Sequence, residues 1–570
     1  MLIYRRSVRR DATLIIIGAA LTHLYSLLNR QQPTQILVNN VSIPPMEKQE
    51  RPIPLATIQE LSTPHGSAKA FQSRFMSTNS DSDVSTIAPT TLLTHAPGWT
   101  VLENLYMSNG TFFIVTDTPQ DFPKIRLMIS KPLILENTAK NIAAREPTAD
   151  DMAFLTMEEA NKRWGEVKPG RKNRISTVGG NTVLVNDPDQ FLGHYYHFVG
   201  ELFFGIQAIW YGTFSSSSNR FNSNSTPNPP ATDALPPIHR VIFARASSIA
   251  WRDFPGFNYY FLRAAFPSTT VEVEDDWEDR AEITATGKRA WRFPLLLLTD
   301  RSASNRGHLC GTVTQRNAAE AVALMRSKTK QKSGGGKERE EGNADIDANA
   351  DMAAWWNPVR DRLFEFADAG HDDVKGLPKP RVAAVHQVGE RNQVVLGGGS
   401  SGQPRLPTPR SIVITYISRQ SAGGRMLTRI SHEELVSALE ELAERKGWEF
   451  NVVQAEFLTH DEQLKLMART TILLGVHGNG LTHVLMMQPT RFSTVIEIFF
   501  PGGFCHDYQW TATHGLGIKH YAVWNDTAHT EGEGEGKPKV NYPSGFQGNS
   551  IPVHGPFVSK LIEDHIERRR

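Results

Sequence analysis

The sequence predicts an α/β protein, and three observations support this fold class. Between residues 411 and 499, short apolar runs typical of buried strands alternate with helical patterns, and the links between them are short. Such alternation indicates a parallel sheet covered by helices on both faces. A glycine-rich turn directly follows one of these runs, at residues 475–480. Further strand and helix patterns precede this region, and a chain of 570 residues is long enough for two domains.

The first part of the chain has the pattern of a membrane-targeting segment. Four arginines between residues 5 and 10 precede an apolar run at residues 12–28. These charges predict a cytoplasmic tail at residues 1–10, a transmembrane signal anchor at residues 11–28 and a lumenal remainder, as in a type II protein of the Golgi or endoplasmic reticulum. A cleaved signal peptide is the alternative, and a mitochondrial presequence ranks third. Residues 29–95, rich in Pro, Ser, Thr and Gln, are expected to form a disordered stem.

Residues 96–290 are predicted to form an N-terminal domain, and residues 291–528 a C-terminal domain. In the first, the patterns predict strands at 111–115, 125–129, 182–185 and 240–244, and helices at 195–211 and 251–266. In the second, they predict strands at 293–298, 411–417, 449–453, 471–476 and 494–499, and helices at 431–446, 459–468 and 481–487. We expect low-complexity inserts at 327–350, 396–409 and 530–548, and a tail at 529–570 that ends in a helix.

The turn at residues 475–480 is the first candidate for a binding site. Its glycines allow the backbone to approach a ligand closely, and the helix expected after it directs N–H groups and a positive dipole end at an anion such as a diphosphate. No Gly-Lys-Ser/Thr follows and the glycine spacing is not Gly-x-Gly-x-x-Gly, which disfavours triphosphate hydrolysis and a nicotinamide cofactor. The alternative is a turn that serves packing alone. The residues expected to bind a nucleotide-sugar here are His477, Gly478, Asn479, Gly480, Leu481 and Thr482.

Three charged residues near other strand ends could complete this site. Arg419 and Arg425 follow the strand at 411–417, where guanidinium groups could hold a diphosphate with paired hydrogen bonds and neutralise it in place of a metal. The alternative is two solvated loop arginines. Glu497, in the strand at 494–499, could accept hydrogen bonds from ribose hydroxyls, or could be a buried acid paired with an arginine.

His197 and Glu201 are the candidate catalytic pair. They are four residues apart in an expected helix and therefore share one face. A histidine oriented by a carboxylate can act as a general base toward an acceptor hydroxyl. The spacing could also place two metal ligands together, but no third ligand is evident in the sequence. The alternative is an aromatic helix packed on a sheet, with its histidines hydrogen-bonded locally.

No metal site is assigned from the sequence. Asp-x-Asp pairs occur in the expected stem at residues 81–83, in a turn before an expected helix at 187–189 and in an expected insert at 345–347, and a divalent metal is not expected to be required. The two cysteines, Cys310 and Cys505, lack metal-ligand spacing and could form one disulfide in an oxidising lumen or remain two buried thiols. With 61 Lys and Arg against 60 Asp and Glu, no charge excess points to nucleic acid.

Four of these segments together resemble glycosyltransferase family 61. Residues 474–483, Leu-Gly-Val-His-Gly-Asn-Gly-Leu-Thr-His, resemble the family's Gly-x-His-Gly-x-Gly-Leu-Thr-Asn core, with His483 where Asn is usual. Residues 495–498 are similar to its following Val-Val-Glu-Ile strand. Residues 195–201 are similar to its Tyr-Tyr-His-Trp-x-x-Glu element, and residues 417–435 to its Ser-Arg…Arg…Glu-Leu region. The resemblance covers about residues 182–524, interrupted by the inserts.

The resemblance implies a GT-B-like fold in which two Rossmann-like domains face each other. It implies an inverting transfer of a sugar (xylose, N-acetylglucosamine or arabinose) from a UDP-sugar to a glycan or glycoprotein acceptor. His197 or Glu201 would take the acceptor proton, Arg419 and the turn would hold the diphosphate, and Glu497 would hold the ribose. The alternative is that the chain is a lumenal protein of the same fold that binds a nucleotide-sugar or a glycan but has no catalytic activity.

Overall fold

In the computed structural model of the chain, the described residues are 86–136, 138–166, 172–215, 235–309, 318–332, 354–369, 406–531 and 538–568. All of them belong to one compact unit that spans residues 67–570. The expected cytoplasmic tail and signal anchor, most of the expected stem, and Cys310 lie outside the described residues. Within the described ranges, no helix combines the length and the apolar character that crossing a bilayer requires.

The N-terminal sheet is mixed. Its strands are β1 (Thr91–Ala96), β2 (Trp99–Ser108), β3 (Thr111–Val115), β4 (Met152–Leu155), β5 (Ile175–Thr177), β6 (Asn181–Val185), β7 (Arg240–Phe243), β8 (Thr270–Glu272) and β9 (Ala290–Thr299). The order is β4-β3-β2-β9-β6-β7-β8, with β1 paired to β2 and β5 to β9. Strands β9, β6, β7 and β8 are parallel neighbours, whereas β2 is antiparallel to both β9 and β3. One half of this sheet therefore has the parallel, Rossmann-like character that the sequence predicts.

Helices connect the parallel strands of this sheet. The segment between β6 and β7 is a continuous helix that begins as the π-helix η3 (Tyr196–Phe203) and continues as α6 (Phe204–Phe214), and α7 (Phe257–Ala265) connects β7 to β8. The expected helix at 195–211 is thus confirmed, and its residues from 198 to 210 are all buried, so this stretch has no exposed polar face. They are buried because one core cluster contains this helix together with residues of both sheets, such as Val183 and Leu473.

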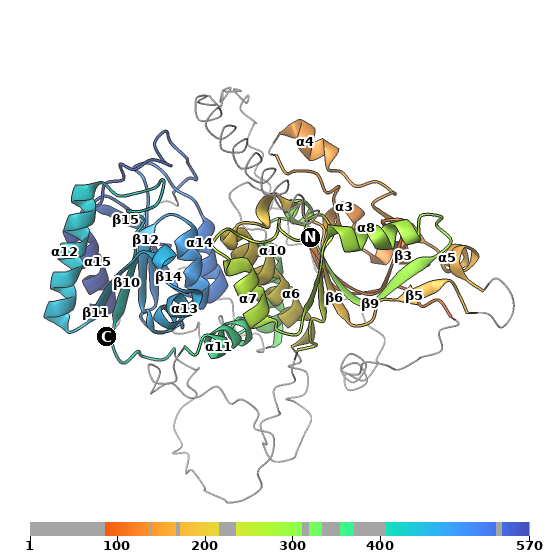
Figure 1. Cartoon of the computed structure of the whole chain (residues 1–570), viewed down its shortest axis with the longest axis horizontal. Helices are drawn as coiled ribbons and strands as arrows, with labels where there is room; N and C mark the ends of the chain where they lie inside the picture. The colour runs from red at the N-terminus through yellow and green to blue at the C-terminus, as the bar shows by residue number, and fades with distance from the viewer. Residues whose placement is uncertain are drawn as a thin grey trace, which may run out of the picture. The chain divides into compact units, whose positions relative to one another are not determined.

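The C-terminal sheet is parallel apart from its last strand. It contains β10 (Val413–Ile417), β11 (Glu449–Val453), β12 (Ile472–Val476), β13 (Thr494–Ile498), β14 (Lys519–Trp524) and β15 (Thr527–His529) in the order β11-β10-β12-β13-β14-β15. Helices α12 (Arg429–Lys446) and α15 (Gly555–Glu567) cover one face, and α13 (His460–Arg469) and α14 (Asp507–Trp510) lie on the other (Figure 1). The predicted sheet covered on both faces is confirmed, since all of β10, β12 and β13 is buried.

Local sequence explains where the helices of this half begin and end. The hydroxyl of Thr459 accepts from the Glu462 backbone while the Glu462 carboxylate accepts from the Thr459 N–H, a capping box that starts α13. Helix α12 ends at Gly447, whose φ of 66° is the left-handed conformation that glycine adopts readily. Its start is earlier than predicted: Thr428 is the cap, and the Ser431 hydroxyl accepts instead from the N–H of Val553, which joins α12 to the segment before α15.

Several predicted elements differ in the structure. Residues 125–129 are not a strand: α3 (Ile125–Met128) is helical, because Ile125 and Met128 pack on the same core cluster at helical spacing. Strand β9, assigned from sequence to the C-terminal domain, is a central strand of the N-terminal sheet. Strand β1 lies in the last residues of the expected stem, and α10 (Ala319–Lys332) extends into the expected insert at 327–350.

Candidate active site

The glycine-rich turn connects β12 to a short helix at the carboxyl end of the parallel sheet. The helix, η6 (Asn479–Met486), is a 3-10 helix rather than the α-helix expected at 481–487. Close packing explains two of the glycines. A Cβ on Gly480 would meet Ile417 of β10 at 3.0 Å, and one on Gly475 would meet Leu481 at 3.2 Å. The turn is thus held tightly against the end of β10, where the two candidate arginines follow.

Arg419 lies directly against the turn. A Cβ on Gly478 would lie 2.9 Å from its Nη1, and its guanidinium donates to the carbonyl of Gly424 through Nε and Nη2. Partial burial lowers the pKa of Arg419, and the neighbouring positive charge of Arg425 lowers it further. Among the residues that the structure describes, neither arginine forms a salt bridge with a carboxylate. Two nearby cations without such a partner are a favourable setting for a dianionic group.

His477 is fixed by a buried carboxylate. Glu497 of β13 has no exposed surface, and it accepts from His477 Nδ1 at 2.5 Å and from His520 Nε2 at 2.7 Å. Burial by itself raises the pKa of Glu497, but the hydrogen bonds from His477 and His520 outweigh it, so that the pKa is lowered. Both carboxylate oxygens are thus bonded to imidazoles rather than to an arginine. These contacts support a positioning role for Glu497, and its binding of ribose stays a prediction.

The predicted His197–Glu201 pair is present in η3. His197 Nδ1 lies 2.8 Å from Glu201 Oε2, and the His197 side chain is 25% exposed while that of Glu201 is 4% exposed. The same carboxylate accepts from the guanidinium of the buried Arg301, whose backbone N–H donates to Asp187. Burial raises the pKa of Asp187 to about 7, while the positive charge of Arg301 opposes this increase. The guanidinium gives this buried carboxylate a cationic partner, and the hydrogen bond to Nδ1 fixes the orientation of the imidazole.

The segment that carries the His197–Glu201 pair contacts the glycine-rich turn through hydrogen bonds. The N–H of Tyr196, the residue before His197, donates to Asn479 Oδ1 at 3.0 Å, and Tyr195 Oη lies 3.4 Å from His483 Nδ1. Partial burial lowers the pKa of His194, as does the nearby His197, and the charges of Arg425 and Asp507 also act on it.

The structure therefore brings together predicted residues that are almost 300 positions apart in the sequence. These residues differ in how far their side chains are exposed to solvent. Leu481 and Thr482 are buried, and the amide of Asn479 bonds to Tyr196, so these three side chains shape the turn from inside. His197, Arg419 and Arg425 are partly exposed and can contact a ligand. Sequence reasoning missed Arg301, His520 and Tyr508, whose hydroxyl lies 3.2 Å from that of Thr482. No local pattern marks these residues, because each meets its partner through the fold.

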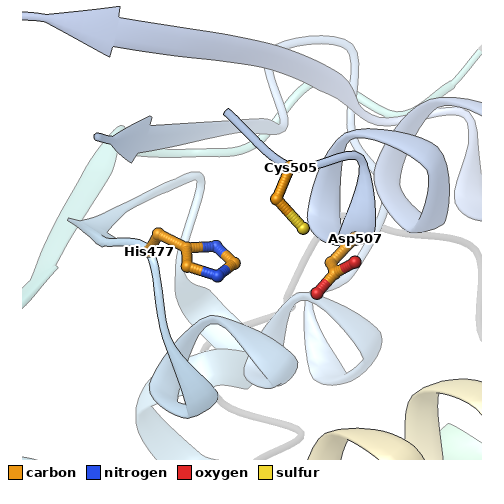
Figure 2. A group of neighbouring side chains, drawn as sticks. All are labelled: His477, Cys505 and Asp507. Carbon is orange, nitrogen blue, oxygen red and sulfur yellow. The ribbon is translucent and has the colours of Figure 1, made fainter. Parts of the chain in front are cut away.

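In the described part of the chain, one group of three side chains has the types and spacing to bind a metal ion. A nitrogen of His477, the sulfur of Cys505 and a carboxylate oxygen of Asp507 all lie within 4.8 Å of one another (Figure 2). Of the aspartate pairs considered from sequence, 81–83 and 345–347 lie outside the described residues, and Asp187 is engaged with Arg301.

Comparison with known proteins agrees with the motifs. Residues 347–496 match the family model described as Glycosyltransferase 61, a region that contains β10, α12, α13, β12 and the turn at His477. Over 96 residues, the chain is 31% identical to the EGF domain-specific O-linked N-acetylglucosamine transferase of Drosophila melanogaster. This match covers 17% of the present chain and 17% of that relative's length.

Proposed function

We propose that this chain, which belongs to glycosyltransferase family 61, is an inverting glycosyltransferase that uses a UDP-sugar as donor. The acceptor is a hydroxyl group of a glycan or glycoprotein, and the sugar is one of the three that the sequence resemblance suggests: xylose, N-acetylglucosamine or arabinose. The two sheet-containing halves form a GT-B-like arrangement, with the donor on the C-terminal half and the acceptor on the N-terminal half.

The contact between Tyr196 and Asn479 carries this proposal. The backbone of Tyr196 is bonded to the glycine-rich turn, and the next residue is His197, whose imidazole is oriented by the Glu201 carboxylate. A transferase needs this proximity, because the base must reach the acceptor oxygen while the donor's anomeric carbon lies between that oxygen and the diphosphate. The match to the family model covers the turn but not His197, whose place beside the turn is given by the hydrogen bond from Tyr196 to Asn479.

The reaction is a single displacement. The acceptor oxygen forms a bond to the anomeric carbon as the bond from that carbon to the diphosphate oxygen breaks, and the diphosphate leaves with the electron pair. The acceptor proton passes to Nε2 of His197, while Nδ1 stays bonded to Glu201. Arg419 and Arg425 balance the negative charge that develops on the leaving diphosphate, together with backbone N–H groups of the turn.

Replacement of His197 tests the proposed function. We expect the purified wild-type protein to be stabilised by UDP in a thermal-shift assay and to transfer sugar from at least one UDP-sugar to a glycan or glycoprotein acceptor. His197→Ala should lower the transfer rate by about 100-fold or more, the range in which general bases act, and should keep the UDP stabilisation. His194→Ala is the matched control, because this neighbouring ring lies 4.8 Å from His197 and is exposed, and it should retain transfer.

Two results would contradict the proposal. Full transfer activity in His197→Ala would remove this residue from the role of base. Stabilisation by UDP without any transfer in the wild-type protein would favour the alternative of a nucleotide-sugar-binding protein.

We further propose that the protein is a single-pass type II protein of the Golgi or endoplasmic reticulum membrane, on the basis of the arginines before residue 11 and the apolar run at residues 12–28. A C-terminal tag on the full chain should be protected from protease in intact microsomes and digested after detergent is added. Digestion without detergent would contradict this orientation.

A further inference from the structure

Three side chains of different chemistry converge at the edge of the candidate site. His477 follows β12, whereas Cys505 lies just before α14 and Asp507 is the first residue of that helix. Figure 2 shows the three side chains directed toward a common centre, and their nearest ligand atoms lie within 4.8 Å of one another. Nitrogen, sulfur and oxygen atoms at this separation need to move only slightly to share one ion, since metal–ligand distances are about 2.0–2.3 Å for zinc.

The orientation of His477 is that of a metal ligand. Its Nδ1 is bonded to Glu497, and this leaves Nε2 as the ring nitrogen for an ion. A carboxylate behind an imidazole is the usual outer partner of a metal-binding histidine, because it fixes the tautomer and raises the basicity of the ligating nitrogen. His520 bonds to the other oxygen of Glu497, so the carboxylate that positions the His477 ring is itself fixed.

Packing of apolar side chains explains only part of this arrangement. Cys505 is 1% exposed and belongs to a small aromatic cluster with Phe499, Phe504 and Phe546, where a buried thiol would serve as a small apolar group. Packing accounts for the burial of the sulfur. It does not by itself explain why a nitrogen, a sulfur and an oxygen ligand atom are grouped at one point.

We propose that His477, Cys505 and Asp507 form a binding site for a thiophilic divalent cation of the zinc class. A thiolate ligand disfavours magnesium and calcium, which prefer oxygen, and a set of one nitrogen, one sulfur and one oxygen ligand suits tetrahedral zinc with the fourth position open to a water or a ligand oxygen. This differs from the expectation from sequence, in which no metal was assigned. The proposal concerns metal binding alone and holds whether or not the chain transfers sugar.

Cobalt substitution tests the site. The full chain is treated with a chelator, dialysed and titrated with Co²⁺ while its absorption spectrum is recorded. We expect one equivalent of Co²⁺ to give the thiolate-to-cobalt charge-transfer band and the visible bands of a tetrahedral ion, and we expect Zn²⁺ to remove them. If the wild-type protein gives no such bands, the proposal is overturned.

Variants assign the band to individual ligands. Cys505→Ser should abolish the charge-transfer band and weaken cobalt binding by more than about 100-fold, since even loss of an outer partner costs about 10- to 100-fold. Cys310→Ser is the matched control, because these are the two cysteines of the chain, and it should leave the spectrum unchanged. A band that persists in Cys505→Ser, or disappears in Cys310→Ser, contradicts the assignment.

A second variant covers the case in which Cys505→Ser does not fold. Asp507→Asn changes a half-buried residue and removes a charge with little change of shape. It should keep the charge-transfer band and weaken cobalt binding by at least tenfold. An unchanged cobalt affinity in this variant, with far-UV circular dichroism like that of the wild type, would exclude Asp507 as a ligand and overturn the three-ligand site.

Discussion

The two halves of the molecule each contain a buried glutamate bonded to a histidine, but they neutralise the carboxylate differently. Glu201 accepts from His197 and from the guanidinium of Arg301, whereas Glu497 accepts from two imidazoles, His477 and His520. An arginine is always charged, so Glu201 has a permanent cation as a partner in addition to His197. Glu497 has no permanent cation beside it and depends on its histidines for partners.

The difference indicates two roles. The ring of His197 is 25% exposed, as the proposed role of general base requires. The side chain of His477 is 9% exposed and is aligned from behind by a carboxylate with no exposed surface. Under the proposed function, the N-terminal pair transfers the acceptor proton, and the C-terminal pair holds the glycine-rich turn in place.

The largest expected effect comes from removing each carboxylate in turn. Glu201→Gln should lower kcat by about 10- to 100-fold, because the orienting partner of the base is lost, and should leave the KM for the UDP-sugar nearly unchanged. Glu497→Gln should instead weaken UDP binding by about tenfold, since the turn loses its alignment. Initial rates against donor concentration separate the two cases. Glu433→Gln, at an exposed salt bridge with Arg429, is the control. If both variants changed kcat and KM equally, the two glutamates would not have the different roles proposed for them.

A somewhat smaller effect is expected at Arg419. Arg419→Met should raise the KM for the UDP-sugar by about tenfold or more, because a hydrogen bond to a charged group contributes about 1.5–3 kcal/mol. Arg419→Lys should fall between wild type and Met, since it keeps the charge and loses the paired geometry. Arg429→Met removes an exposed guanidinium from α12 and should leave KM unchanged. If Arg419→Met also leaves KM unchanged, the C-terminal half does not hold the diphosphate as proposed.

Gly478→Ala tests the same contact from the opposite side. The added methyl group would meet Arg419 Nη1 at 2.9 Å, and the flexible guanidinium can move away. We therefore expect the melting temperature to stay close to that of the wild type while the KM for the donor rises by several-fold to about tenfold, as expected for a partly lost charged hydrogen bond. Gly179→Ala, at a position where a Cβ meets no atom within 4 Å, is the control. An unchanged KM in Gly478→Ala would show that the position of Arg419 is not important for donor binding.

The smallest expected effect is on the free energy of unfolding, and it comes from His483, whose hydrogen-bond partners are an amide and a phenol instead of a carboxylate. Burial lowers the pKa of His483 to about 4, and the nearby His460 acts in the same direction, while Gln463 and Tyr195 are its hydrogen-bond partners. The folded state therefore keeps His483 neutral, and the unfolded state takes up a proton below about pH 6.5, so this contribution to stability is lost as the pH falls.

Between pH 7 and pH 5.5, this linkage should cost about 1 kcal/mol of unfolding free energy. Urea denaturation of the wild type and of His483→Gln at the two pH values measures the difference. The variant should lose less stability on acidification. The same loss in both proteins would indicate that His483 titrates normally and that the contrast with the carboxylate-paired histidines is unfounded.

The C-terminal half could be predicted from sequence because its information is local. The box at Thr459, the glycine at 447 and the apolar runs of β10, β12 and β13 each specify their own element. The candidate residues of the turn and of η3 were also recognisable, since each lies in a short motif. The mixed N-terminal sheet was not predicted, because the pairing of β2 with β9 joins strands about 190 residues apart and no short pattern encodes it.

The contacts that give the site its chemistry were the least predictable. Arg301 is an ordinary arginine at a helix start in the sequence, and only the fold brings it to Glu201. Phe546 was assigned to an insert of low apolar content, yet it is 3% exposed and packs against Phe499 and His477. Long-range partners of this kind depend on tertiary packing, which overrides local composition.

The π-helix that contains His197 makes the length of this segment as important as its composition. A π-helix turn holds more residues than an α-helix turn. Deletion of one residue between His197 and Glu201 would allow the segment to revert to regular α-geometry, which reaches α6 in nearly the same orientation with one residue fewer. The buried side chains of α6 would then keep their neighbours, whereas the spacing of His197 and Glu201 along the segment would change. A change in the number of residues here would therefore act on the His197–Glu201 pair more than on the packing of α6.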